Sequence, residues 1–87
     1  MKIKEDFLLR KVADCYVVVP VGKATVDFNG MMNLNETGAF LWEKLENETT
    51  KEELLKAMLD EYDVPENVAK TDIDNFINKL KDGNLLE

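Results

Sequence analysis

Histidine is absent from this sequence of 87 residues, and cysteine occurs only once, at Cys15. Zinc-type metal sites are built from several histidine and cysteine ligands, and a catalytic cysteine is usually activated by a histidine. A single cysteine also cannot form a disulfide within the chain. The sequence therefore predicts no metal site, no cofactor and no histidine-based catalysis, and we expect Cys15 to be a small buried side chain in a strand.

Long hydrophobic runs are absent as well. The longest, CYVVVPV at residues 15–21, is far shorter than the roughly 20 residues that a membrane-spanning helix needs. The opening residues, MKIKEDF, lack the apolar segment of a secretory signal. The two prolines and four glycines are scattered and form no linker. We expect one cytoplasmic domain over residues 1–87, without a membrane partner, because chains this short rarely divide into two domains.

Negative charge dominates, since 18 acidic residues against 11 basic ones give a net charge of −7. Residues 36–63 hold three lysines and nine carboxylates, a net charge of −6, whereas residues 1–35 carry a net charge of +1. The carboxylates are spaced as on solvated helix faces rather than gathered in apolar surroundings that would tune them for acid–base chemistry. The chain is therefore not expected to be an enzyme.

A β-hairpin is predicted at the start of the chain. The first strand is FLLRKV at Phe7–Val12, and the second is the β-branched run CYVVVPV. Ala13 and Asp14 between them form a plausible two-residue turn, because aspartate tolerates turn conformations. Pro20 cannot donate to a strand ladder, so it should mark the end of the second strand or a sheet edge.

Helical patterns occupy the rest of the chain. Asn35 is predicted to cap a first helix, and Thr50 to cap a second through a capping box in which Glu53 reaches back to the cap. Asp63 and Glu66 repeat the box pattern before a third helix, which Gly83 ends as the residue after the last turn. The apolar stripes of the three helices are Ala39, Phe40, Trp42 and Leu45; Leu54, Leu55, Met58, Leu59 and Tyr62; and Val68 or Ala69, Ile73, Phe76, Ile77 and Leu80.

A third strand, MMNL at residues 31–34, follows the type I′ turn signal Asn29-Gly30. Strands grouped before helices indicate an α+β fold. The predicted arrangement is winged helix-turn-helix-like, with an N-terminal three-stranded antiparallel sheet followed by three helices. The final residues, LLE, are expected to pack back as a short extended tail.

The third strand is expected to form an unprotected sheet edge. Edge strands are usually guarded by charge, proline or a bulge, and MMNL carries neither charge nor proline. Such an edge suits the addition of a peptide as an extra strand. Two other readings remain: a homodimer that pairs through this edge, and an edge covered by the chain's own tail.

A winged-helix regulator that binds DNA is a further alternative, which the charges disfavour. A recognition helix must bring positive charge to phosphates, yet residues 65–82 hold three lysines against four carboxylates. The only arginine is Arg10, so the helices cannot make the bidentate arginine contact with guanine. No nucleic-acid partner is expected.

Four segments together resemble the PqqD-like family: FLLRKVADCYVVVPVG, DFNGMMNLNETGAFLWEKL, TKEELLKAMLDEYDV and DIDNFINKLKDGNLLE. The resemblance covers about Phe7 to Leu86, and its most specific part is LNETGAFLWEKL. The family has the fold of the RiPP recognition element, the peptide-binding domain of pathways that make and modify ribosomal peptides. The resemblance implies a non-catalytic peptide chaperone. Such a protein binds the leader segment of a precursor peptide and presents it to a modifying enzyme, often a radical S-adenosylmethionine (radical SAM) protein.

The resemblance also implies where the peptide binds. In the family, the leader is added beside the third strand, in a groove closed by the third helix. Carried over to this sequence, the expected peptide-binding residues are Met31, Met32, Asn33 and Leu34 from the strand, and Asp72, Asn75, Phe76 and Lys79 from the helix.

Overall fold

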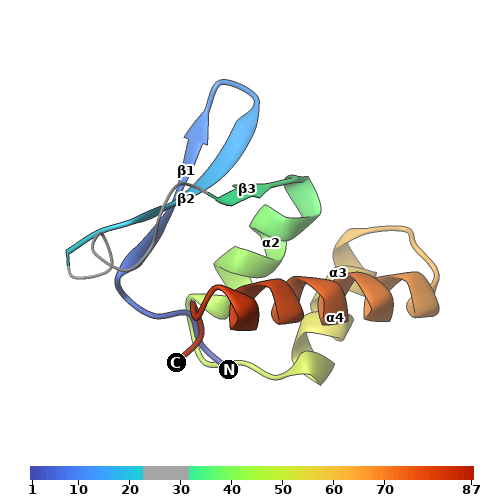
Figure 1. The fold of residues 1–87 in the computed structure, drawn as a ribbon. Coiled ribbons are helices and arrows are strands. Elements are labelled where there is room, and N and C mark those ends of the chain that lie inside the picture. The colour runs from blue at the N-terminus through green and yellow to red at the C-terminus, as the bar shows by residue number, and fades with distance from the viewer. Residues whose placement is uncertain (23–31) are drawn as a thin grey trace.

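An antiparallel sheet followed by helices makes up the computed structural model, which describes residues 1–22 and 32–87. The strands β1 (Phe7–Val12), β2 (Cys15–Pro20) and β3 (Met32–Leu34) lie in the order β1-β2-β3. The helices α2 (Glu36–Leu45), α3 (Lys51–Glu61) and α4 (Glu66–Asp82) follow (Figure 1). The predicted α+β fold is therefore confirmed, while the likeness to a winged helix is descriptive only.

The hairpin register agrees with the predicted turn. Val12 pairs with Cys15, so Ala13 and Asp14 form a two-residue connection, in which Ala13 has a positive φ of 56°. The second strand ends at Pro20, as its missing N–H predicts. Both the Asn29-Gly30 turn signal and the first residue of the predicted third strand lie outside the described residues.

Cys15 is exposed, so the prediction of a buried cysteine is wrong. The pairing of β2 with β3 reaches only as far as Tyr16, which lies opposite Leu34. The hairpin extends beyond that point (Figure 1), and Val12, the partner of Cys15, is 58% exposed. The sequence pattern of β2 predicts its pairing with β1. It does not predict how far β3 extends along β2, and this extent decides whether Cys15 is covered.

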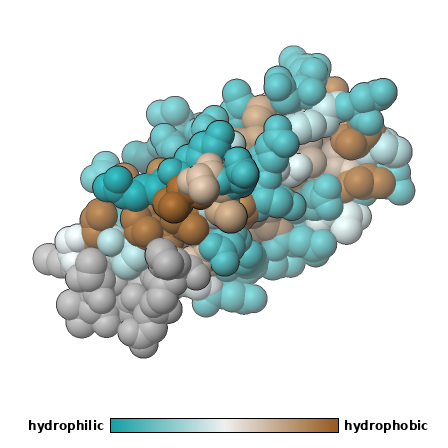
Figure 2. All heavy atoms as spheres, turned by 90° about the horizontal axis from the view of Figure 1, so that it is seen from above, coloured by the Kyte–Doolittle hydropathy of each residue, from teal (hydrophilic) through white to brown (hydrophobic). Residues whose placement is uncertain are grey.

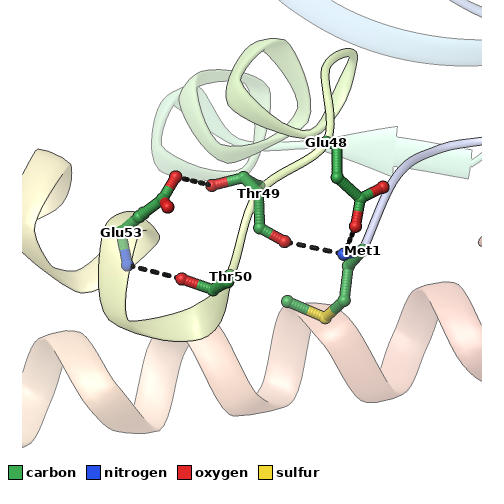
Figure 3. Close-up of polar contacts among 5 residues, drawn as sticks. All are labelled: Met1, Glu48, Thr49, Thr50 and Glu53. Atoms are coloured by element: carbon green, nitrogen blue, oxygen red, sulfur yellow. Dashed lines mark hydrogen bonds and ion pairs between the residues drawn. The ribbon is translucent and has the colours of Figure 1, made fainter.

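Side-chain caps begin the first two helices. Asn35 Oδ1 accepts from the Gly38 N–H at 2.7 Å, and Thr50 Oγ1 accepts from the Glu53 N–H at 3.2 Å. The returning half of the predicted box differs, because the Glu53 carboxylate accepts from the Thr49 hydroxyl at 3.1 Å (Figure 3). The same connection between α2 and α3 is tied to the chain start, where the Met1 amino group donates to the Thr49 carbonyl.

The capping box predicted for α4 is wrong. The N-cap is Pro65, which makes no side-chain cap hydrogen bond, and Asp63 lies two residues too early to cap. The Pro65 carbonyl instead accepts from the N–H groups of Val68 and Ala69, both at 3.1 Å. Of the two candidates for the buried stripe, Ala69 is fully buried and Val68 is 41% exposed.

One core joins the sheet to all three helices. Val18 of β2 is completely buried, as are Leu45, Ile77 and Leu80 of the helices. The core therefore holds one face of the sheet against the helices, with α4 among them. The surface seen from above is mainly hydrophilic, with apolar side chains gathered in patches (Figure 2).

The C-terminal tail packs back as predicted. Leu86 forms an antiparallel bridge with Ile3, and the Lys4 N–H donates to the Leu85 carbonyl at 2.9 Å. Both chain ends accordingly lie close together (Figure 1). The tail thus pairs with the start of the chain and not with β3.

Gly83 directly follows the last residue of α4, as predicted, but it lacks the positive φ that a glycine in this position usually adopts. Its φ is −84°, and the neighbouring Asn84 adopts the left-handed conformation, with a φ of 59°. A Cβ added to Gly83 would lie only 2.5 Å from Leu85 Cδ1, and Leu85 is completely buried. Glycine is therefore needed here for close packing rather than for positive φ.

We predict that Gly83→Ala lowers the free energy of unfolding by about 1–3 kcal/mol, because the new methyl group displaces a buried side chain. Asn84→Gly is the matched control. It should not lower the free energy of unfolding in the same way, since Asn84 has a positive φ and glycine adopts that conformation without strain. Urea denaturation followed by circular dichroism measures both variants. Equal midpoints for Gly83→Ala and the parent protein would contradict the packing argument.

Candidate functional site

A groove of about 360 Å³ lies between β3, the start of α2 and one side of α4. The large side chains buried in its lining are apolar, and the exposed ones carry amides or charges. The groove is lined by Asn33, Leu34, Asn35, Thr37, Gly38, Leu41, Asp72, Asn75, Phe76 and Lys79.

The α4 wall follows from helical spacing. Residues 72, 75, 76 and 79 recur at intervals of three, one and three, so they share one side of the helix. Phe76 is buried, whereas Asp72, Asn75 and Lys79 are exposed. The buried stripe of α4 thus anchors the helix to the core, and its neighbouring polar positions form the wall of the groove.

α4 runs in the opposite direction to β3. A Cβ placed on Gly83 would lie 3.6 Å from Met32 Cε, and one on Gly38, just after β3, would lie 3.5 Å from Phe76 Cε1. Between these points, Lys79 contacts Asn33. The beginning of β3 therefore lies beside the end of α4, and the end of β3 beside its middle.

One hydrogen bond spans the mouth of the groove. The Lys79 Nζ donates to the Asn33 carbonyl at 3.2 Å, across 46 positions of sequence. Within a strand, the N–H and C=O of one residue point to the same side and those of its neighbours to the other. Because β2 covers the opposite side of β3 and the lysine comes from α4, the Asn33 N–H and C=O face the groove.

The groove edge of β3 has no strand partner within residues 1–22 and 32–87, where the sheet order ends at β3. The tail does not cover it, because Leu86 pairs with Ile3. Among the described residues, this edge therefore keeps the backbone groups of Asn33 available to an added strand, with Lys79 on one of them.

Gly38 keeps the groove floor hollow. An added Cβ there would lie 3.2 Å from Asn35 Oδ1 and 3.3 Å from Leu34 Cβ. Both are closer than ordinary van der Waals contact, so a larger residue would push against the capping side chain and the strand. The glycine that weakens α2 as a helix former thus leaves space between β3 and α4.

The structure brings six of the eight predicted site residues into one groove. These are Asn33, Leu34, Asp72, Asn75, Phe76 and Lys79. Met32 is half-buried and packs against the core beside the end of α4, outside the groove lining. Met31 lies outside the described residues.

The contribution of α2 is the part that sequence reasoning missed. Asn35 was predicted only as a cap, and Thr37, Gly38 and Leu41 were not singled out. Gly38 and Leu41 are three residues apart within α2, a spacing that places them on one side of the helix, which begins just after Leu34 ends the strand. That spacing was a usable signal.

Neither a metal site nor a membrane span is found in the described part of the chain. No three histidine, cysteine or carboxylate side chains there could jointly hold a metal ion. None of the described helices has the length and apolar character needed to cross a bilayer.

The sequence matches a recognised protein family. The chain belongs to the PqqD family, whose model, described as coenzyme PQQ synthesis protein D, matches residues 15–86. No curated protein matches the chain.

Two solved structures resemble this fold. One is "TbiB1 in Complex with the TbiA(beta) Leader Peptide", with a TM-score of 0.77 and 25% identity over 100% of this chain and 95% of the other. The other is "Lasso peptide synthetase B1 complexed with the leader peptide", with a TM-score of 0.74 over 97% of this chain and 93% of the other. At 18% identity, the second shows the fold alone.

We predict that Asn35→Ala lowers the free energy of unfolding by about 1 kcal/mol, because the Gly38 N–H at the groove floor loses its acceptor. For a domain of this size, that corresponds to a melting temperature lower by about 4–8 °C. Asn35→Asp keeps a capping oxygen and is the control. If thermal denaturation gave Asn35→Ala the melting temperature of the parent, Asn35 would not stabilise α2.

Proposed function

We propose that this protein is a non-catalytic peptide chaperone that binds the leader segment of a ribosomally synthesised precursor peptide. The leader is added as a strand to β3 and lies in the groove beside α4. The observation that carries the proposal is the Asn33 edge of β3, which faces an open groove and has no strand partner among the described residues. Membership of the PqqD family and the leader-peptide complexes of the two similar folds support it.

Backbone and side chains have separate roles in this mechanism. The Asn33 N–H and C=O pair with the peptide backbone and set its register, whatever the peptide sequence. Alternate side chains of an extended peptide point to one face, so every second residue enters the groove. There it meets Leu34, Leu41 and Phe76 on the apolar floor, which selects apolar anchor residues.

The peptide is disordered before it binds, so part of the interaction energy is used to order it. An affinity in the micromolar to nanomolar range is typical of such coupled folding and binding. Moderate affinity also suits a chaperone that must release the peptide after modification.

The second partner is the modifying enzyme, which we propose to be a radical SAM protein. Residues 36–63, which include α2 and α3, carry a net charge of −6. A basic surface on the enzyme would be steered towards these helices, because complementary charge accelerates encounter more than it raises affinity. The groove and the acidic helices could then be used at the same time, in the cytoplasm where precursor and enzyme are made.

We predict that Asn33→Pro abolishes peptide binding and leaves the fold intact. Proline removes the N–H that faces the groove, and edge strands tolerate this loss. Asn33→Ala keeps the N–H and is the matched control, expected to bind as the parent does. The probes are overlapping synthetic peptides covering the precursor encoded beside the gene, titrated by calorimetry, with circular dichroism as the test of folding.

The same titration separates the proposal from a homodimeric scaffold that pairs through β3. A chaperone shows shifts of the Asn33 and Leu34 amide signals as peptide is added, and it remains a one-to-one complex by light scattering. A stable dimer whose amide signals ignore every peptide would overturn the proposed function.

A further inference from the structure

The two ends of the groove carry opposite charges. Asp72 and Lys79 both line it and lie seven residues apart on α4, which is about 10 Å at 1.5 Å per residue. Lys79 lies beside the middle of β3. Asp72 lies further towards the start of α4, on the side of the groove that α2 lines through Asn35 and Thr37.

Three other charged side chains of α4 form ion pairs. Lys70 pairs with Glu66 at 3.9 Å, and Asp74 pairs with Lys51 at 3.2 Å. Asp72 makes no ion pair with any residue that the structure describes, and the bond of Lys79 goes to a backbone carbonyl. Lys81 and Asp82 likewise form no ion pair with a described residue, but they do not line the groove. Asp72 and Lys79 are thus the charged side chains of α4 that can meet a ligand's charge there.

The Asn33 carbonyl that accepts from the Lys79 ammonium is also the acceptor that an added strand would use. When a peptide N–H takes the place of the ammonium group at this carbonyl, Lys79 is free to turn towards the peptide. The released ammonium stays in the groove, beside the peptide, where an aspartate or glutamate side chain is the acceptor that best replaces the carbonyl.

The direction of the peptide follows from the direction of α4. Antiparallel strand pairs outnumber parallel ones about two- to threefold, so we take the peptide to run antiparallel to β3. Since α4 also runs opposite to β3, the peptide and α4 run the same way. The peptide therefore passes Asp72 first and Lys79 later.

Resting on the proposed function, we infer that the groove selects leader peptides by the order of their charges. A basic residue is placed at Asp72, and an acidic residue two or four positions later is placed at Lys79. About 10 Å along the groove corresponds to about three residues of an extended strand, and only an even separation puts both side chains on the face that enters the groove. Lys79 thus binds the Asn33 carbonyl when no peptide is present, and it pairs with the acidic residue when a peptide occupies the edge of β3.

The test is a selection of random 12-residue peptides, displayed on ribosomes or phage, by the immobilised full-length chain. The parent is expected to enrich peptides in which Lys or Arg precedes Asp or Glu by two or four positions. Lys79→Glu should exchange the preference at the later position for Lys or Arg, and Asp72→Lys should exchange the earlier one for Asp or Glu. Lys81→Glu and Asp82→Lys change the same helix outside the groove and should leave both preferences unchanged.

A selected peptide then gives the size of the effect. Replacing its acidic residue by glutamine should weaken binding to the parent roughly two- to fivefold, the range expected of an exposed ion pair. The same replacement should leave binding to Lys79→Met unchanged, because that variant has no ammonium group to pair. The difference should shrink at high salt.

The outcomes separate this inference from the proposed function. If the parent captures peptides without charge enrichment, with the reverse order of charges, or with a preference that survives Lys79→Glu, the charge reading is wrong and strand addition still stands. If the parent captures no peptide at all, the proposed function itself is overturned.

Discussion

The packing of α4 against α3 and into the common core is the constraint on which the groove depends. Ile73, Ile77 and Leu80 are almost completely buried, and they fix the rotation of the helix. With that rotation set, Asp72 and Lys79 can only lie along the side next to β3. The wall of the groove is thus positioned by residues that never reach it, and its polar side chains are free to vary without cost to the core.

A free strand edge must also be protected, because unpaired backbone groups invite aggregation. Here β3 is only three residues long, and Lys79 occupies the Asn33 carbonyl. Both features limit the edge to a short stretch beside α4, inside a groove that a flat second sheet would not fit. The edge is therefore accessible to a narrow extended chain and poorly accessible to another folded sheet.

Local signals predicted most of the fold, and tertiary packing accounts for the exposure of Cys15 and for the role of Gly83. Asn35 and Thr50 were recognisable as caps because a cap is specified by its own side chain and the next three residues. The exposure of Cys15 depends on where β3 stops, and the role of Gly83 depends on Leu85 folding back against it. Neither could be read from a local pattern. In the groove, the α4 positions came from the family resemblance, whereas the α2 wall required knowing how that helix packs beside α4.

The edge of β3 alone can contribute little to the free energy of peptide binding, because one hydrogen bond is exchanged for another. A peptide N–H that reaches the Asn33 carbonyl displaces the Lys79 ammonium, and a hydrogen bond that replaces another contributes little net free energy. Backbone pairing therefore sets the register of a bound peptide without securing it. The affinity must come from apolar side chains on the floor formed by Leu34, Leu41 and Phe76 and from the new partner that Lys79 finds. Selectivity in this fold follows from that division, because the carbonyl that could pair with any peptide already accepts from Lys79 in its absence.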